Sequence, residues 1–239
     1  YGLGQGRTER AAGLPLPVVR ALALTPQNED GRYSVAYGQG STIFAYTWTG
    51  TEPVPLPLAG ELDFSVSFAP INFGDPFAAG SFPYSFGSAE IRLAVFTRDF
   101  YVGQTLFPSA IACGVSGVIA SGSSIIGRGG FASGGVTQNV SSTLDLSNDC
   151  AGNPLMLNPG DEVYIHAFLA AYAQRGAVTD ARNTFRIALA EGTPAEVREA
   201  IRRGLSISVV PEPASWALMI CGFGAVGAAL RRRGALLEA

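Results

Sequence analysis

The chain has 239 residues, of which 47% are hydrophobic and 15% are charged, and its net charge is -3. This composition excludes a disordered chain, and the lack of a basic block outside the extreme C-terminus excludes nucleic acid as a partner. The 30 glycines and 15 prolines favour many turns over long helices.

The N-terminal residues carry no recognisable export signal. The chain begins at Tyr1, and residues 1–20 lack the basic start and apolar run of a secretory signal. We interpret this end as truncated, so export has to be inferred from the C-terminus.

The clearest strand signal lies at residues 62–68, where Leu62, Phe64, Val66 and Phe68 alternate with polar residues. A period of two is typical of a strand with one buried face. Similar runs predict further strands at residues 18–24, 32–37, 42–48, 89–96, 163–172, 184–189 and 205–210.

Spacers rich in Gly, Pro and Asn separate these strands, with almost no amphipathic helix between them. They lie at residues 28–31, 38–40, 53–57 and 158–161. The sequence therefore predicts an all-β fold, an antiparallel β-sandwich or jelly-roll-like domain.

One short helix is predicted at residues 194–203. Thr193, Pro194 and Glu196 have the spacing of an N-cap, a first-turn proline and a capping-box acid, and Gly204 is a stop signal. Residues 114–135 are dense in Gly and Ser, which predicts a loop or an irregular sheet edge that is either merely mobile or a binding loop.

The C-terminal tail has three parts. A Pro-Glu-Pro segment is forced into an extended conformation that an enzyme can grip. Residues 214–230 carry no charge and as a helix would span about 25 Å, close to the thickness of a bilayer core. Three arginines follow and, by the positive-inside rule, hold this end in the cytoplasm. The residues assigned to sorting are Pro211, Glu212 and Pro213, and those assigned to the topology stop are Arg231, Arg232 and Arg233.

This order of parts, with Trp-Ala-Leu-Met-Ile-Cys-Gly-Phe-Gly after Pro-Glu-Pro, resembles the PEP-CTERM sorting tail of Gram-negative bacteria. The resemblance implies cleavage near Pro-Glu-Pro by an exosortase-type enzyme, transient anchoring in inner-membrane lipid, and delivery to the cell surface or extracellular matrix. It divides the chain into a β-sandwich ectodomain at 1–209, a sorting tail at 210–233 with a transmembrane helix at 214–230, and a cytoplasmic extension at 234–239. The extension departs from the family pattern.

Cys113 and Cys150 lie outside the apolar tail. In an oxidising compartment two such cysteines predict a disulfide, which would tie down the Gly/Ser-rich excursion.

The sequence nominates no catalytic constellation, cofactor or metal site. His166 is the only histidine, and without a Gly-x-Ser-x-Gly motif a structural role is favoured over a Ser-His-Asp triad. Zinc would need more ligands than the chain offers. The acidic and amide residues weighed for calcium are Asp145, Asn148 and Asp149, and the carboxylates weighed for glycosidase chemistry are Asp63, Glu90, Asp99, Asp161 and Glu162.

Aromatic residues allow two interpretations. Tyr33, Tyr37, Tyr46 and Trp48 lie on neighbouring predicted strands, and Tyr46 and Trp48 share a face. Such rings either pack in the core, the favoured interpretation, or stack on a sugar. We therefore expect a non-enzymatic structural or adhesive protein of the surface or matrix, with a carbohydrate-binding module for exopolysaccharide as the alternative and an exported hydrolase less favoured.

Overall fold

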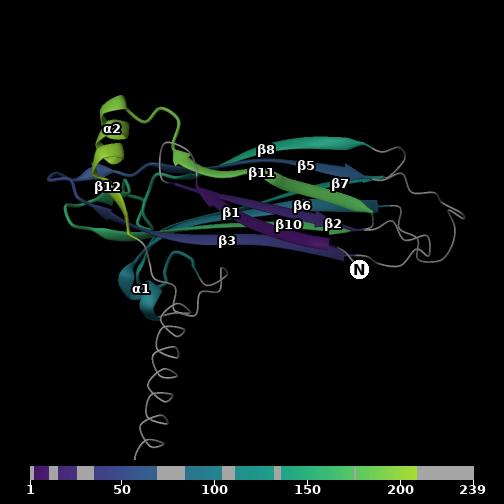
Figure 1. Cartoon of the computed structure of the whole chain (residues 1–239), viewed down its shortest axis with the longest axis horizontal. Helices are drawn as coiled ribbons and strands as arrows, with labels where there is room; N and C mark the ends of the chain where they lie inside the picture. The colour runs from purple at the N-terminus through teal and green to yellow at the C-terminus, as the bar shows by residue number, and fades with distance from the viewer. Residues whose placement is uncertain are drawn as a thin grey trace, which may run out of the picture. The chain divides into compact units, whose positions relative to one another are not determined.

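The computed structural model describes residues 3–10, 16–25, 35–68, 84–103, 111–131, 136–174 and 176–208. Two five-stranded sheets lie against each other (Figure 1). Sheet A has the order β1 (Leu3–Arg10), β2 (Pro17–Leu24), β11 (Ala177–Leu189), β5 (Leu58–Phe68), β8 (Thr137–Leu146). Sheet B has the order β12 (Leu205–Ser208), β3 (Val35–Trp48), β10 (Glu162–Gln174), β6 (Tyr84–Thr97), β7 (Val118–Phe131).

The smaller elements are β4 (Val54–Pro55) paired with β9 (Met156–Leu157), and the helices α1 (Arg98–Gly103) and α2 (Ala195–Gly204). Both helices lie at the same end of the sandwich (Figure 1). The pairings whose register is resolved are all antiparallel. The all-β antiparallel sandwich predicted from the sequence is therefore confirmed.

The strands pair in a nested pattern. β2 pairs with β11, β3 with β10, β5 with β8 and β6 with β7, so early strands meet late ones. One long antiparallel ribbon rolled into two sheets gives this nesting, which is the connectivity of a jelly roll.

The core lies between the two sheets. From sheet A, Leu62, Phe64, Val66 and Phe68 are each at most 4% exposed, as their alternation predicted. Sheet B contributes the fully buried Ile91, Leu93, Ile165 and Leu169. Burying each such side chain stabilises the fold by roughly 1.5–3 kcal/mol, which is enough to fix which face of each strand points inward.

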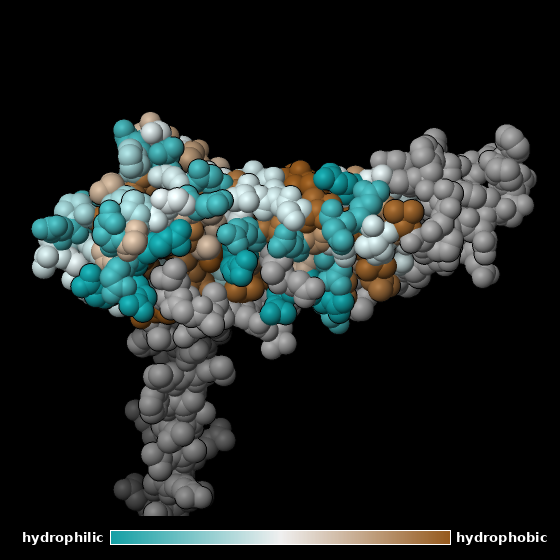
Figure 2. All heavy atoms as spheres, turned by 90° about the horizontal axis from the view of Figure 1, so that it is seen from above, coloured by the Kyte–Doolittle hydropathy of each residue, from teal (hydrophilic) through white to brown (hydrophobic). Residues whose placement is uncertain are grey.

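The outer face of sheet A is polar. Glu61 of β5 and Arg186 of β11 form an ion pair at 3.0 Å, and the hydroxyls of Ser67 and Thr137 lie 2.9 Å apart across β5 and β8. Figure 2 shows hydrophilic side chains spread over the molecule as seen from above, with smaller apolar areas between them. This face needs no cover from another element.

Two expectations about loops are wrong. Residues 38–40, predicted as a turn, lie inside β3, where a Cβ on Gly38 would come within 2.0 Å of the Leu22 carbonyl oxygen. Glycine is required there because the backbones of β2 and β3 approach so closely. Residues 114–135, predicted as irregular, contain the edge strand β7, and Gly127 leaves room for the ring of Phe86 on β6.

Helix α2 forms as predicted, but its capping box does not. Pro194 occupies the N-cap without a side-chain cap, and the Thr193 hydroxyl instead donates to the Ala190 carbonyl at 2.6 Å. Ile201 is 1% exposed and Val197 packs beside it against the core. Burial of this stripe, rather than capping, holds the helix on the sandwich.

The chain divides into two compact units, Tyr1–Ile207 and Ser208–Ala239. The sandwich and both helices belong to the first unit.

Candidate functional site

Cys113 and Cys150, the pair expected from the sequence, form a disulfide with a sulfur-to-sulfur distance of 2.15 Å. Cys113 precedes β7 of sheet B, and Cys150 follows β8 of sheet A. The Cys150 amide also donates to the Ile119 carbonyl at 2.8 Å. The bridge therefore ties together the ends of two edge strands that belong to different sheets.

The acidic residues weighed for metal or glycosidase chemistry either accept hydrogen bonds that stabilise turns or lie on the faces of strands. The Asp149 carboxylate accepts hydrogen bonds from the amides of Ala151 and Asn153, and the Asn153 bond is the largest of several that lower the pKa of Asp149. Asp145 accepts from the Ser147 amide at 2.9 Å. No group of three His, Cys, Asp or Glu able to hold a metal ion occurs among the residues that the structure describes.

The carboxylates weighed for glycosidase chemistry are spread over β5, β6, α1 and the start of β10. Asp63 lies on the exposed face of β5 in sheet A, whereas Glu90 lies on β6 in sheet B, paired with Arg92. Asp161 accepts from the Asn158 amide at 2.7 Å in the turn before β10. Glu162 accepts from the Tyr164 hydroxyl at 2.8 Å.

His166 is buried on the outer face of β10, at 2% exposure, and its Nε2 lies 2.9 Å from the Ser41 hydroxyl of β3. Its Nδ1 is buried without a hydrogen-bond partner. A buried N–H group without a partner costs more free energy than a buried acceptor nitrogen without one. We therefore assign the proton to Nε2, which then donates to Ser41. In this tautomer His166 is not placed to take the Ser41 proton, and no third group orients the ring as a triad requires.

Burial, and next the positive charge of the nearby Arg92 guanidinium, together lower the pKa of His166 from 6.5 to about 4. The imidazole is therefore neutral at neutral pH. The sequence favoured a structural role for His166 but gave no means of finding Ser41, which is 125 positions away.

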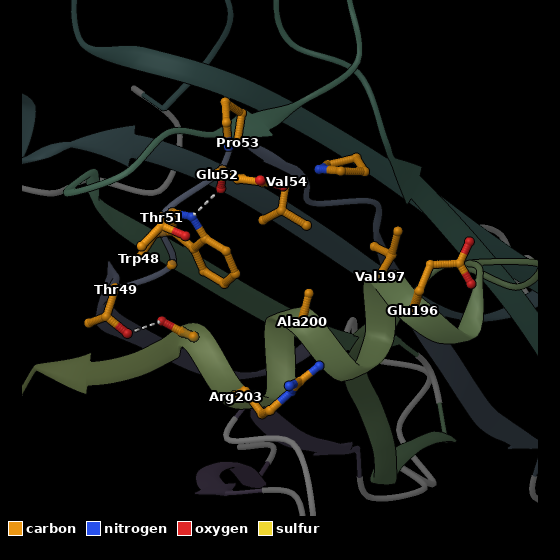
Figure 3. A pocket seen from close by; sticks show the side chains of 13 residues that line it. Trp48, Thr49, Thr51, Glu52, Pro53, Val54, Glu196, Val197, Ala200 and Arg203 are labelled. Carbon is orange, nitrogen blue, oxygen red and sulfur yellow. Dashed lines mark hydrogen bonds between the residues drawn. The ribbon is translucent and has the colours of Figure 1, made fainter.

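A cavity of about 600 Å³ lies between α2 and the segment that follows β3. Figure 3 shows the side chains of Val54, Val197 and Ala200 pointing into it. The charged residues of its lining are Glu52, Glu196 and Arg203.

Two hydrogen bonds close the wall of this cavity: Trp48 Nε1 donates to the Glu52 carbonyl and Thr49 Oγ1 to the Gly204 carbonyl, each at 2.9 Å (Figure 3). The cavity thus lies at the interface between α2 and the segment that follows β3.

The structure argues against the carbohydrate contact weighed for Tyr46 and Trp48. Tyr46 is fully buried and Trp48 is 4% exposed, both within the core. A Cβ placed on Gly50 or on Gly204 would lie 2.2 or 2.4 Å from the nearest atom of the Trp48 ring. Because the indole is enclosed between these glycines, neither ring offers a face to a sugar, and core packing is the interpretation that holds.

A different aromatic surface lies on the outer face of sheet B, and we call it the tyrosine patch. It consists of Tyr37, Gln39 and Ser41 on β3, Tyr172 on β10, and Glu90 and Arg92 on β6.

The strand register arranges these residues in three rows. Across β3 and β10, Tyr37 lies opposite Tyr172; across β3, β10 and β6, the other two rows run Gln39, Ala170, Glu90 and Ser41, Phe168, Arg92. Tyr37 is 51% exposed, and the Arg92 guanidinium lies over the Phe168 ring at 5.6 Å.

Sequence analysis noticed Tyr37 but did not assign it to a surface. The alternation of Tyr37, Gln39 and Ser41 with Gly38 and Gly40 was the available signal, because it places all three polar or aromatic side chains on one face. This alternation was missed because Gly38 and Gly40 were interpreted as part of a turn.

Comparison with known proteins bears chiefly on the tail. No curated protein matches the chain. A solved structure described as that of infectious bursal disease virus Gx strain aligns over 94% of this chain and 67% of its own, with 7% identity and a TM-score of 0.20, which carries no argument. Residues 209–233 match the family described as the PEP-CTERM protein-sorting motif.

The chain ends in a PEP-CTERM sorting motif. This confirms the resemblance drawn from the sequence, and its restriction to the tail. The motif supports export of the chain through exosortase-type sorting.

The PEP-CTERM motif begins one residue after β12, which ends at Ser208. Within the described part of the chain, which stops at residue 208, no helix has both the length and the apolar character needed to cross a membrane. The predicted transmembrane helix at 214–230 lies outside that part. So do Pro211, Glu212 and Pro213 and the arginines Arg231, Arg232 and Arg233.

Proposed function

We propose that this protein is anchored for a time in the inner membrane by residues 214–230, cleaved near Pro-Glu-Pro, and released as a structural or adhesive protein of the cell surface or extracellular matrix. The match of residues 209–233 to the PEP-CTERM motif carries this proposal. Membrane lipid and an exosortase-type enzyme are its first partners, and residues 1–209 are the part that is delivered.

Two features of the sandwich support delivery to an oxidising exterior and a non-enzymatic role. The Cys113–Cys150 disulfide is of the kind that persists outside the cytoplasm. Among the described residues, Ser41 lies against His166, and with the proton assigned to Nε2 the imidazole donates to the hydroxyl, which favours a structural role for this pair over that of an exported hydrolase.

Cleavage is tested by expressing the full chain in a host with and without an exosortase and measuring the mass of the recovered protein. We expect a C-terminal truncation within or just after residues 211–213 only in the first host. Changing Pro211, Glu212 and Pro213 together to Ala should leave the chain uncut. The matched control is Glu191→Ala, an exposed acid in a turn of the sandwich.

Anchoring is tested separately by flotation of the full chain with vesicles of phosphatidylethanolamine and phosphatidylglycerol. We expect the uncut chain to float with the vesicles and a chain ending at residue 209 to stay behind. A full-length chain that remains in the soluble fraction would contradict the membrane step.

A further inference from the structure

The tyrosine patch combines a ring surface with hydrogen-bonding groups. Rows along a strand are about 7 Å apart, so the Tyr37–Tyr172 row and the Ser41–Arg92 row lie about 14 Å apart. Phe86 extends the ring surface, since its centroid lies 6.1 Å from that of Tyr172. Ile125 on β7 lies opposite Glu90 and is 71% exposed, which continues the middle row with an apolar side chain.

Tyr37, Gln39 and Ser41 supply uncharged hydrogen-bonding groups to the patch. Partial burial, and next the Glu90 carboxylate, raise the pKa of Tyr37, while Arg92 opposes this shift. The Tyr37 phenol is therefore a neutral donor. Because His166 donates to the Ser41 oxygen, the Ser41 hydroxyl proton is free to donate outward, and exposed Gln39 supplies both a donor and an acceptor.

The charges of the patch cancel. Arg92 pairs with Glu90 at 2.5 Å, and the two are only 29% and 22% exposed. A duplex or acidic peptide would need an unpaired cation to bind here. A neutral partner rich in hydroxyl groups complements such a surface better.

A pyranose has this complementary chemistry, because it presents C–H groups on its flat faces and hydroxyls around its rim. Aromatic rings stack on the C–H groups, and amide, hydroxyl and guanidinium groups form hydrogen bonds with the hydroxyls. We propose that the tyrosine patch is a binding site for neutral polysaccharide, with Tyr37 and Tyr172 as the stacking surface and Gln39, Ser41 and the Glu90–Arg92 pair as the hydrogen-bonding rim.

This inference deepens the proposed surface role by naming a partner. Its test is independent of sorting, because binding is measured on purified uncut chain whereas sorting is measured by cleavage in cells. Tyr37→Ala should be cleaved like the unaltered chain, so failure of either proposal leaves the other standing.

Binding is tested by depletion of the full chain, kept in mild detergent, from solution over cellulose, curdlan and dextran, with alginate as the acidic counterpart. We expect retention on at least one neutral polysaccharide. Tyr37→Ala should weaken that binding about tenfold, the loss of one well-placed ring contact. Tyr37→Phe keeps the ring and should stay within about threefold of the unaltered chain.

The matched control is Met156→Ala, which removes an apolar side chain of 40% exposure on β9, outside the patch, and should leave binding unchanged. Gln39→Ala serves as a second patch variant whose folding is not at risk, because Gln39 is exposed, and should weaken binding several-fold. No retention on any neutral polysaccharide, retention on alginate alone, or equal binding by Tyr37→Ala and Met156→Ala would overturn the proposal.

Discussion

His166 is buried in surroundings that disfavour its charged form. Its neighbours on the outer face of sheet B are Ser41 of β3, whose hydroxyl is hydrogen-bonded to Nε2, and Arg92 of β6, which repels a positive charge. The folded protein therefore binds a proton at this ring only near pH 4, whereas an unfolded chain does so near 6.5. Stability linked to this residue is present above pH 6.5 and is lost as the pH falls through 4.

We predict that acidification from pH 7 to 4.5 lowers the free energy of unfolding by about 2–3 kcal/mol through this histidine. Urea unfolding at both pH values measures the change. In His166→Leu, whose side chain is apolar and cannot titrate, the decrease in the free energy of unfolding should be smaller by that amount. An equal decrease in both proteins would show that His166 is not responsible and that carboxylates dominate.

Ser41 shows the limit of sequence reasoning at the scale of single residues. The strand period placed His166 correctly, because it depends on neighbours in the chain. The partner of His166 depends on the register between β10 and β3, which no local pattern encodes. The disulfide partners were found because two cysteines outside the tail leave only one pairing.

Helix α2 ends at Gly204, which lies in close contact with the ring of Trp48. A Cβ at Gly204 would lie 2.4 Å from that ring. Gly-to-Ala changes within helices usually stabilise by about 1 kcal/mol, so a destabilising outcome here would be diagnostic of the close contact.

We predict that Gly204→Ala lowers the free energy of unfolding by about 1–3 kcal/mol, the usual cost of overpacking. Thermal or urea unfolding measures it. Trp48→Leu, which shortens the obstructing side chain, should cancel much of the penalty when the two changes are combined. If the two losses simply add, the ring is not the cause.

Among the elements, those with strict alternation were predictable and those built from small residues were not. β5 was found because its buried side chains, Leu62, Phe64, Val66 and Phe68, are large and alternate with polar ones. β7 was predicted as loop because Gly and Ser give no hydrophobic period, although its backbone pairs with β6 over almost its whole length. An edge strand of this kind is specified by its neighbour more than by its own sequence.

At the scale of the whole sandwich, the Cys113–Cys150 bridge links the edge strands β7 and β8 of the two sheets across 37 positions of sequence. Both cysteines are exposed, so replacing them removes little packing. The bridge acts mainly by restricting the unfolded chain.

We predict that reduction lowers the free energy of unfolding by up to about 4 kcal/mol, the chain-entropy value for a loop of this length. Urea unfolding with and without reductant measures the difference. The double variant Cys113→Ser, Cys150→Ser should match the reduced protein and respond to reductant no further. A reductant effect that persists in the double variant would contradict this origin.

Because early strands pair with late ones, the two sheets cannot be completed until the last part of the chain is present. The Thr25 hydroxyl bonds the Ala177 carbonyl across 152 positions, and Trp48 is covered only when Gly204 arrives. For a polypeptide threaded outward from its N-terminus, we expect β3, and the edge of β2 that pairs with β11, to remain unpaired until most of the chain has been translocated. Folding would then finish next to the lipid, with the arrested tail acting as a tether while the final strands are added.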